Sequence, residues 1–517
     1  MRRVLICVAF ATWSFSNFWF AIAERRVLYF LREAPLRAPL PAVIGWEALL
    51  TVAMLLAWRM GAAHPRWRRR TESIFLGACI LPVGIASAAL LRLSPLLTRI
   101  VGARFFWPAA ALAAVWPLIQ AARHPETLAR AMRAAFLWSW PVLTVVMFQA
   151  AVNMLRYGSQ DYADRPTAPR LRSYPRDIRV VWIIFDEASQ AMAFSSRPTG
   201  LSLPNFDRLR RESFYATAAV APGGETRISM PALILGEHVI NTEPDGPSDL
   251  RVETARGAFS WNCARNVFDD AREAGFNTAV VGWYHPYGRL LNRSLTEYFW
   301  TATGVEPGLE AQFHASAPGA MLDRAWLQVA SLPLSGHLSV LSPLRYQRRV
   351  RARDFRDLME RASRVAADPE IGLVLAHLPV PHSPGFYDRA ASRIDADHPS
   401  SYIDNLALAD RALGDLRRAI EQAGLSDRTA LIVSADHGWR TAMWRTLPGW
   451  TRQDESVARG DTSGVPFLVQ LPNESAGMVY KSPFDTIITR GLITEILHRR
   501  ITTLGQIAQQ IASPAFP

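Results

Sequence analysis

The sequence predicts an N-terminal domain of five membrane-spanning helices followed by an α/β domain with a mostly parallel central sheet. Three observations lead to this fold class. The first 155 residues consist largely of long apolar runs. From residue 178 onwards, short apolar runs alternate with segments of helical periodicity, which is typical of α/β domains. The run Val180–Phe185 is apolar without interruption, as expected for a strand buried on both faces of a parallel sheet.

Five apolar segments in the N-terminal third are each close to the ~20 residues that a helix needs to cross a bilayer. They cover about residues 4–22, 39–58, 73–91, 105–121 and 134–154. Arg2 and Arg3 precede the first segment, as in a signal peptide. However, its apolar stretch is long and rich in Trp, and no small-residue cleavage site follows it. We therefore expect a first span that is retained.

The flanking arginines favour an N-terminus inside the cytoplasm. In that orientation the inner segments hold more arginines than the outer loops, chiefly through Arg66, Arg68, Arg69 and Arg70. An odd number of spans then puts everything after residue 155 outside the cytoplasm.

The domain boundaries follow from a change in composition. Residues 156–177 are polar, contain three prolines and several arginines, and do not offer enough apolar surface to fold alone. We expect a transmembrane domain over 1–155, a juxtamembrane linker over 156–177, the α/β domain over 178–500 and a C-terminal tail over 501–517.

Strands and helices alternate within the α/β domain. Helical spacing is found at Pro204–Arg211, Phe268–Ala274 and Tyr402–Ala423, and further buried strands are expected at Thr278–Gly282, Ile371–Ala376 and Thr429–Ser434. In sheets of this kind, ligands gather at the carboxyl ends of the strands.

The formal net charge of +12 does not indicate nucleic-acid binding. All basic residues except Lys481 are arginine, and they are dispersed, with no basic cluster interleaved with aromatics in the α/β part. Cys7 and Cys79 lie in apolar segments and Cys263 stands alone, so we expect no disulfide within the α/β domain.

Acidic residues and a histidine follow two of the predicted strands. Asp186 and Glu187 come directly after the first strand, and Asp436 and His437 follow the strand Thr429–Ser434. These side chains should therefore share one edge of the sheet.

A glycine-rich turn should bring a hydroxyl to the same edge. Gly223 and Gly224 precede Thr226, and the apolar residues that follow suggest a helix beginning there. A hydroxyl at a helix N-terminus benefits from the positive end of the dipole and from free N–H groups that suit phosphate oxygens.

Together these residues predict a metal-activated threonine nucleophile. A threonine hydroxyl is a poor nucleophile at neutral pH, and a bound metal can activate it. Glu187, Thr226, Asp436 and His437 supply four ligands, with Asp186 competing with Glu187 for the same role. Carboxylate and imidazole ligands favour zinc, with manganese or magnesium as alternatives.

Several motifs between residue 178 and about residue 500 resemble the alkaline phosphatase/sulfatase superfamily. They are the strand ending in Asp186-Glu187, the segment Leu203–Leu209, Thr226-x-x-Ser229-x-Pro231, Pro381–Pro384, Ser434–Gly438 and Val465-Pro466-Phe467. With five spans in front, the chain resembles the membrane-anchored phosphoethanolamine transferases that decorate lipid A and, more distantly, the lipoteichoic acid synthases.

This resemblance implies a sulfatase-like catalytic domain on the periplasmic or extracellular side of a bacterial inner membrane. It implies that Glu187, Thr226, Asp436 and His437 bind the catalytic metal. The expected reaction moves a phosphoethanolamine or phosphoglycerol head group from a membrane phospholipid to Thr226, and then to an envelope glycan or lipid acceptor. His382 is expected to bind the substrate phosphate or protonate the leaving group.

Departures from the family pattern keep alternatives open. Gly464 stands where a histidine is common, which leaves a second metal site open, and the disulfides usual in the transferases are missing. No formylglycine motif surrounds Cys263, which argues against formylglycine-dependent sulfatase chemistry. A membrane-tethered phosphatase, phosphodiesterase or other sulfatase-like hydrolase would use the same residues with water as acceptor, and a non-catalytic envelope protein with a relic site would bind no metal.

Overall fold

The computed structural model describes residues 2–24, 28–30, 40–63, 123, 125–157, 167–175, 177–302, 343–460, 462–472, 474 and 476–513. The chain forms two compact units, one that comprises Met1–Tyr162 and Gly308–Pro343 and one that comprises Ala163–Pro307 and Leu344–Pro517. The predicted domain boundaries at residues 155, 177 and 500 stay predictions.

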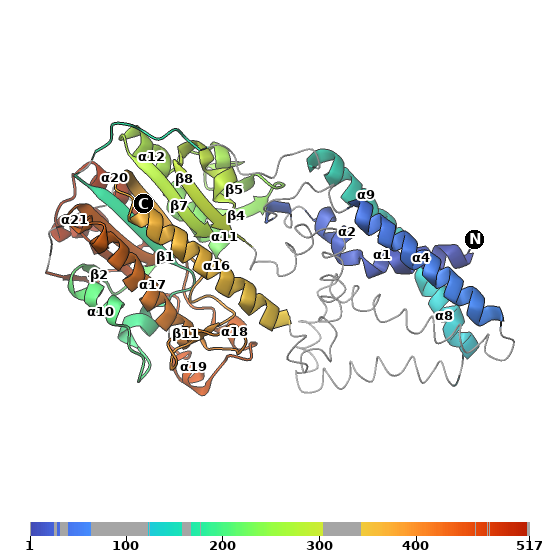
Figure 1. Cartoon of the computed structure of the whole chain (residues 1–517). Helices are drawn as coiled ribbons and strands as arrows, with labels where there is room; N and C mark the ends of the chain where they lie inside the picture. The colour runs from blue at the N-terminus through green and yellow to red at the C-terminus, as the bar shows by residue number, and fades with distance from the viewer. Residues whose placement is uncertain are drawn as a thin grey trace. The chain divides into compact units, whose positions relative to one another are not determined.

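The N-terminal unit is helical (Figure 1). Its helices are α1 (Arg2–Ser14), α2 (Ser16–Ala23), α4 (Leu40–Ala63), α8 (Pro125–Trp138) and α9 (Trp140–Tyr157). α1 packs against α4 and α8, and α2 packs against α9. Large apolar side chains remain exposed on α4 and α9, among them Leu56 and Phe148. Water would penalise such contiguous apolar surface, whereas lipid would not.

Two helices among the described residues are long and apolar enough to cross a bilayer. They lie at Val43–Met60 and Arg133–Tyr157, close to the predicted spans 39–58 and 134–154. The predicted span 4–22 is divided between α1 and α2 at Phe15. The predicted spans 73–91 and 105–121 lie outside the described residues. Helices of this length and apolar composition also occur in the cores of soluble proteins, so the five-span domain stays a prediction.

The second unit is a mixed α/β domain built on an eight-stranded, mostly parallel sheet (Figure 1). In order across the sheet, its strands are β14 (Met478–Tyr480), β2 (Phe214–Ala216), β13 (Phe467–Gln470), β12 (Thr429–Ala435), β1 (Arg179–Phe185), β9 (Ile371–Leu378), β7 (Asn277–Trp283) and β8 (Glu297–Thr301). Only the pairings of β13 with β12 and with β2 are antiparallel among these described strands. The parallel α/β fold predicted from the apolar runs is confirmed.

Helices and small sheets surround this sheet. The helices are α10 (Pro204–Arg211), α11 (Thr226–Leu235), α12 (Val267–Glu273), α13 (Tyr287–Leu290), α16 (Pro343–Ala366), α17 (Tyr402–Gln422), α18 (Thr441–Trp444), α19 (Arg452–Val457), α20 (Thr489–Leu497) and α21 (Leu504–Ala512). Short helical turns are η1 (Ala191–Ser195), η2 (Trp261–Cys263), η3 (Asn292–Ser294), η6 (Ser426–Arg428) and η7 (Thr486–Ile488). The small sheets pair β3 (Ala219–Val220) with β15 (Phe484–Asp485), β10 (Tyr387–Asp388) with β11 (Arg393–Ile394), and β4 (Val239–Pro244) with β5 (Leu250–Thr254) and β6 (Gly257–Ser260).

The register of the central strands brings their carboxyl ends into line. β1 lies between β12 and β9, and Phe185, its last residue, pairs with Ala435 on one side and Leu378 on the other. β7 continues the row, with Gly282 beside His377. The residues that follow these four strands therefore meet at one edge of the sheet.

Candidate metal centre

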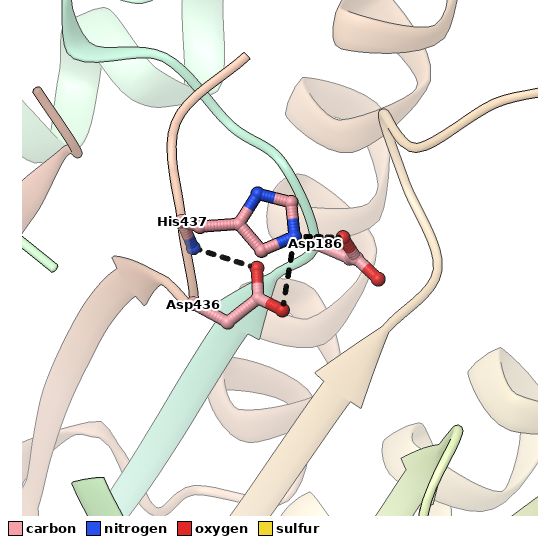
Figure 2. A group of neighbouring side chains, drawn as sticks. All are labelled: Asp186, Asp436 and His437. Carbon is pink, nitrogen blue, oxygen red and sulfur yellow. Dashed lines mark hydrogen bonds and ion pairs between the residues drawn. The ribbon is translucent and has the colours of Figure 1, made fainter. Parts of the chain in front are cut away.

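Three side chains at this edge converge on one point (Figure 2). Asp186 follows β1, and Asp436 and His437 follow β12. His437 Nε2 lies 3.4 Å from Asp186 Oδ1 and 3.7 Å from Asp436 Oδ2. All three residues are buried, and their candidate ligand atoms lie within 4.8 Å of one another.

These three atoms fit a divalent cation. Asp186 Oδ1, Asp436 Oδ2 and His437 Nε2 are buried and have no hydrogen-bond partner among the described residues. Buried polar atoms of this kind are costly unless a ligand satisfies them. Bonds of about 2.0–2.2 Å to a tetrahedral zinc ion would set ligands roughly 3.3–3.5 Å apart. The donor set suits zinc, and the distances of 3.4 and 3.7 Å from His437 Nε2 to the two carboxylate oxygens are close to that spacing.

Backbone hydrogen bonds orient the cluster. Asp436 Oδ1 accepts from the N–H of His437 at 2.8 Å and from the N–H of Glu187 at 3.1 Å. His437 Nδ1 lies 2.9 Å from the carbonyl oxygen of Gly438, so Nδ1 carries the proton and donates. That tautomer leaves Nε2 with a lone pair directed at the two carboxylates, as metal ligation requires.

The charges of the cluster depend on one another. Burial, followed by repulsion from Asp436, raises the pKa of Asp186 well above its usual range. Burial also acts to raise the pKa of Asp436, but His437 and His377 outweigh it and lower that pKa. For His437, burial lowers the pKa while Asp436 and Asp186 raise it, and the net direction is upward. A cation bound at these atoms would favour the ionised carboxylates and the neutral imidazole, because only those forms act as ligands.

Thr226 lies beside the cluster at the start of α11. Its Oγ1 donates to Asp186 Oδ2 at 3.4 Å, and the side chain is 4% exposed. The turn before it is tight, because a Cβ added to Gly223 would lie 2.7 Å from Ile228 Cγ2 and 2.9 Å from Ser229 Oγ. The helix predicted from Ile228, Met230 and Leu233 is confirmed, and it presents the hydroxyl at its positive end.

The carboxylate of Glu187 faces a different partner. Glu187 has φ of 70°, which is uncommon for a residue with a side chain. Its Oε1 accepts from the backbone N–H of Arg440 at 2.7 Å, and the Arg440 guanidinium lies 3.6 Å away. Among the acidic pair after β1, the structure therefore brings Asp186, and not Glu187, together with Asp436 and His437. The metal role predicted for Glu187 stays a prediction.

A tyrosine hydroxyl supports this unusual turn. The hydroxyl of Tyr402, in α17, donates to the carbonyl oxygen of Glu187 at 3.0 Å and accepts from the N–H of Ser189 at 3.0 Å. Because Glu187 departs from extended backbone geometry, with a φ of 70°, alternation along the strand could not identify which carboxylate enters the site.

His382 follows β9 and is held by two partners. Its Nδ1 lies 2.6 Å from the carbonyl oxygen of Ser383, to which it donates, and its Nε2 accepts from Arg440 Nη2 at 2.5 Å. Burial, followed by the charges of Arg351 and Arg440, lowers the pKa of His382 well below its usual value. In this arrangement His382 is neutral and orients Arg440. Its predicted role toward the substrate stays a prediction.

Two further histidines lie at the site. His377, within β9, is buried with Nε2 3.9 Å from Asp436 Oδ2, and its Nδ1 contacts the hydroxyl of Tyr287 at 3.0 Å. His285 follows β7, and its Nε2 donates to the carbonyl oxygen of Thr226 at 3.4 Å. The position of both residues near strand ends was the signal in the sequence that could have grouped them with the cluster.

A cavity of about 450 Å³ adjoins the nucleophile turn. Its lining includes Val220, Gly223, Gly224, Trp439 and Arg440. Gly464, where the family pattern has a histidine, offers only backbone near this point, and its carbonyl oxygen accepts from the N–H of Gln190 at 2.9 Å. The cavity gives a ligand a route to the turn that carries Thr226.

The comparisons with known proteins concern the second unit. A family model described as type I phosphodiesterase / nucleotide pyrophosphatase matches residues 239–485. The matched part includes His377, His382, Asp436 and His437, and it begins after Thr226. No curated protein matches the chain.

Three of the solved structures that resemble this chain illustrate how distant the likeness is. One is a sulfatase (6S-sulf) involved in glycosaminoglycan metabolism by Bacteroides thetaiotaomicron, with 15% identity, 63% of this chain and 78% of that chain covered, and a TM-score of 0.43. Another is a phosphonate monoester hydrolase of Agrobacterium radiobacter, with 14% identity, 62% and 74% covered, and a TM-score of 0.36. A third is murine ectonucleotide pyrophosphatase / phosphodiesterase 5 in complex with AMP, with 11% identity, 62% and 95% covered, and a TM-score of 0.36.

These three likenesses are too distant to say anything about substrate. The finding that bears on the candidate site is the family match, because it covers Asp436 and His437 but not Asp186 or Thr226. Over residues 239–485, the chain is similar to the type I phosphodiesterase / nucleotide pyrophosphatase family.

Proposed function

We propose that the chain is a metal-dependent enzyme that cleaves a phosphodiester through a covalent intermediate on Thr226. The observation that carries this proposal is the hydroxyl of Thr226, buried at a helix N-terminus and 3.4 Å from Asp186 Oδ2. Asp186 belongs to the cluster whose ligand atoms lie within 4.8 Å of one another. A hydroxyl beside such a cluster is the arrangement expected of an activated nucleophile.

The residues of the site divide the chemistry between them. A divalent cation held by Asp186, Asp436 and His437 would lower the pKa of the Thr226 hydroxyl and polarise a phosphoryl oxygen. The Thr226 proton, directed at Asp186 Oδ2, leaves as the Oγ–P bond forms. The P–O bond to the leaving alcohol then breaks, and the released alkoxide takes up one proton. The N–H groups at the start of α11 stabilise the negative oxygens of the phosphoryl group.

We infer that the donor substrate is a membrane phospholipid. Its cleavage releases diacylglycerol and leaves phosphoethanolamine or phosphoglycerol on Thr226. An envelope glycan or lipid hydroxyl is the acceptor that regenerates the threonine. Apolar helices on the same chain would hold the enzyme at the surface where such a donor lies, and this raises the effective concentration of the donor lipid at the site. Hydrolysis, with water as acceptor, is the alternative that the family match favours.

The cofactor that suits this centre is zinc, with manganese or magnesium as alternatives. Two carboxylates and an imidazole nitrogen are ligands that zinc accepts at short distances.

We infer that the protein lies in a bacterial plasma membrane with its catalytic unit on the outer side, because the donor lipid and an envelope acceptor meet there.

The test is a threonine series in the purified full-length protein, assayed with bis(p-nitrophenyl) phosphate and added zinc. We expect Thr226→Ala to lose activity by at least about 10³-fold, and Thr226→Ser to retain part of it because Ser keeps the hydroxyl. Thr217→Ala, a half-buried threonine on another turn, serves as the control. Mass spectrometry after incubation with the donor lipid should find the head group on Thr226. Full activity in Thr226→Ala would overturn the proposal.

A second measurement separates the transferase from the alternatives. Incubation with radiolabelled phosphatidylethanolamine or phosphatidylglycerol, with and without an envelope lipid acceptor, should move label to the acceptor if the enzyme is a transferase. Release of soluble head group alone indicates a hydrolase. A protein that binds no metal by elemental analysis would be the non-catalytic alternative.

A further inference from the structure

Arg351 is a buried cation next to the candidate metal centre. It lies on α16, is 2% exposed, and its Cζ lies 3.9 Å from the centre of the Trp283 ring. Trp283 ends β7 and also contacts the ring of His382, with 5.3 Å between ring centres. The guanidinium therefore packs over an aromatic ring at the edge of the sheet where the metal cluster lies.

Two of its nitrogens lack a partner. Arg351 Nε and Nη1 are buried and form no hydrogen bond with any described residue. A buried guanidinium with unsatisfied N–H groups is costly unless a partner completes it, and a bound anion is such a partner. Arg179 also has two unpartnered nitrogens, but it begins β1 and so lies at the opposite end of the strand from Asp186. Among these two arginines, only Arg351 lies at the ligand-binding edge.

The charges around Arg351 tie it to the site. Burial lowers its pKa to about 10, so it remains a cation at neutral pH, and the attraction of Asp186 is the leading effect that opposes the decrease. Asp354, a buried carboxylate on the same helix, and then Glu187 attract it as well, whereas Arg440 repels it. The positive charges of Arg351 and Arg440 both lower the pKa of His382, as expected for cations near that ring. Arg440 in turn lines the cavity beside the Thr226 turn.

We propose that Arg351 binds a non-bridging oxygen of the anionic group on which the enzyme acts, a phosphate or sulfate group. The proposal rests on the proposed function of the site and extends it to the residue that selects an anion. The guanidinium, packed on Trp283, carries a positive charge and unpartnered N–H donors at Nε and Nη1, either of which can donate to an oxygen of a tetrahedral oxyanion. Arg351 thereby makes the site selective for anionic esters over neutral ones.

The experiment measures binding of inorganic phosphate and of sulfate to the full-length, zinc-loaded protein by calorimetry. The variants are Arg351→Met, which keeps an apolar body against Trp283, Arg351→Lys, and Arg356→Gln as a control on the exposed side of the same helix. We expect the Kd for phosphate to rise at least about 10-fold in Arg351→Met and less in Arg351→Lys, with Arg356→Gln unchanged. Zinc content should stay the same in all four proteins.

Unchanged phosphate and sulfate binding in folded Arg351→Met would overturn the proposal, because a structural arginine would alter the unfolding temperature and not the Kd. Absence of phosphate and sulfate binding to zinc-loaded wild type would also overturn it. If Arg351→Met does not fold, Arg351→Lys decides: its single ammonium group keeps the charge but cannot place donors where Nε and Nη1 lie, and a wild-type Kd in this variant refutes the proposal. Thr226→Ala, included in parallel, should still bind phosphate, so failure of Thr226 as nucleophile is distinguishable from failure of Arg351 as anion ligand.

Discussion

Asp186 and Glu187 are adjacent in sequence but face different partners. The positive φ of Glu187 turns its carboxylate to the backbone N–H of Arg440, while Asp186 stays beside His437. The two carboxylates therefore have separable jobs. Asp186 is placed to bind a cation, and Glu187 is placed to hold the loop after β12 against β1.

We predict that Asp186→Asn loses bound zinc and that Glu187→Gln retains it. Loss of a direct ligand should lower metal affinity by more than about 100-fold, since residues that only support ligands already contribute roughly 10- to 100-fold. Glu187→Gln should instead lower the free energy of unfolding by about 1–3 kcal/mol, because a charged hydrogen bond to a buried N–H is weakened. Elemental analysis and chemical denaturation measure the two effects. Zinc lost from Glu187→Gln and kept in Asp186→Asn would contradict this assignment.

His285 gives the fold a sensitivity to acid. Burial lowers its pKa from the ordinary 6.5 to about 3, so the folded state holds the ring neutral. Between these values the unfolded chain binds one proton more than the folded chain. The stability that neutral His285 contributes is therefore present above pH 6.5 and decreases as the pH falls toward 3.

We predict that His285→Gln removes part of this pH dependence. At pH 5 the wild type should have lost about 2 kcal/mol of unfolding free energy through His285, an order-of-magnitude value from the shift. The variant should start less stable at pH 7 and lose correspondingly less by pH 5. Urea denaturation of both proteins after metal removal gives the difference, since release of a cation then does not contribute. Equal losses in both proteins would exclude His285 as the source.

At the scale of elements, the turn before α11 decides where the nucleophile lies. Gly223 packs so closely on Ile228 and Ser229 that a Cβ has no room, whereas a Cβ at Gly224 would meet nothing within 4 Å. Neither glycine has a positive φ, so the difference between them is one of packing alone. The pair offers a matched test of how tightly the turn positions Thr226.

We predict that Gly223→Ala lowers kcat by about 10- to 100-fold while Gly224→Ala stays within about 2-fold of wild type. The added methyl group must push the first turn of α11 away, and a shift near 1 Å at a reacting atom is enough for a loss of this size. Steady-state kinetics with bis(p-nitrophenyl) phosphate give the comparison, and zinc content should be normal in both variants. Equal kcat in the two variants would show that the turn adjusts without moving Thr226.

At the scale of the whole molecule, the chain joins an apolar helical unit to an α/β unit that carries the site. The exposed apolar side chains of α4 and α9 are suited to lipid, and the two candidate spans are of bilayer length. Chemical labelling of a native cysteine can show on which side of the membrane the α/β unit lies. Cys263 is exposed on that unit, whereas Cys7 is buried in the N-terminal helices.

We predict that a membrane-impermeant maleimide labels Cys263 in intact spheroplasts. The thiol is accessible on the α/β unit, so labelling before lysis means that this unit lies outside the cytoplasm. Cys263→Ser should remove the signal, which controls for the other cysteines. Labelling that requires lysis would place the unit inside and would remove envelope acceptors from the proposed function.

Much of the fold follows from local patterns. The strands expected at Val180–Phe185, Thr278–Gly282 and Ile371–Ala376 are present within a residue or two of their predicted ends. The helix expected at Pro204–Arg211 has those bounds. Buried parallel strands must be apolar on both faces, so composition alone reveals them.

Contacts between distant segments could not be read in this way. The grouping of Asp186 with Asp436 and His437 depends on β1 and β12 being neighbours, and the entry of Asp186 depends on the backbone angle of Glu187. His377 and Arg351 are buried beside them because β9 and α16 pack there. Periodicity predicts that these residues lie in a strand and a helix, but it does not predict that those elements lie next to the site.

The sequence by itself determined the apolar N-terminal part, the parallel α/β domain, and a hydroxyl, carboxylates and a histidine at one edge of its sheet. Only the tertiary structure decided which of two adjacent carboxylates joins the cluster and which buried cation lies beside it. The physical reason is that periodicity and composition report how a residue meets water, whereas ligand geometry depends on backbone angles and strand order fixed by packing across the whole domain.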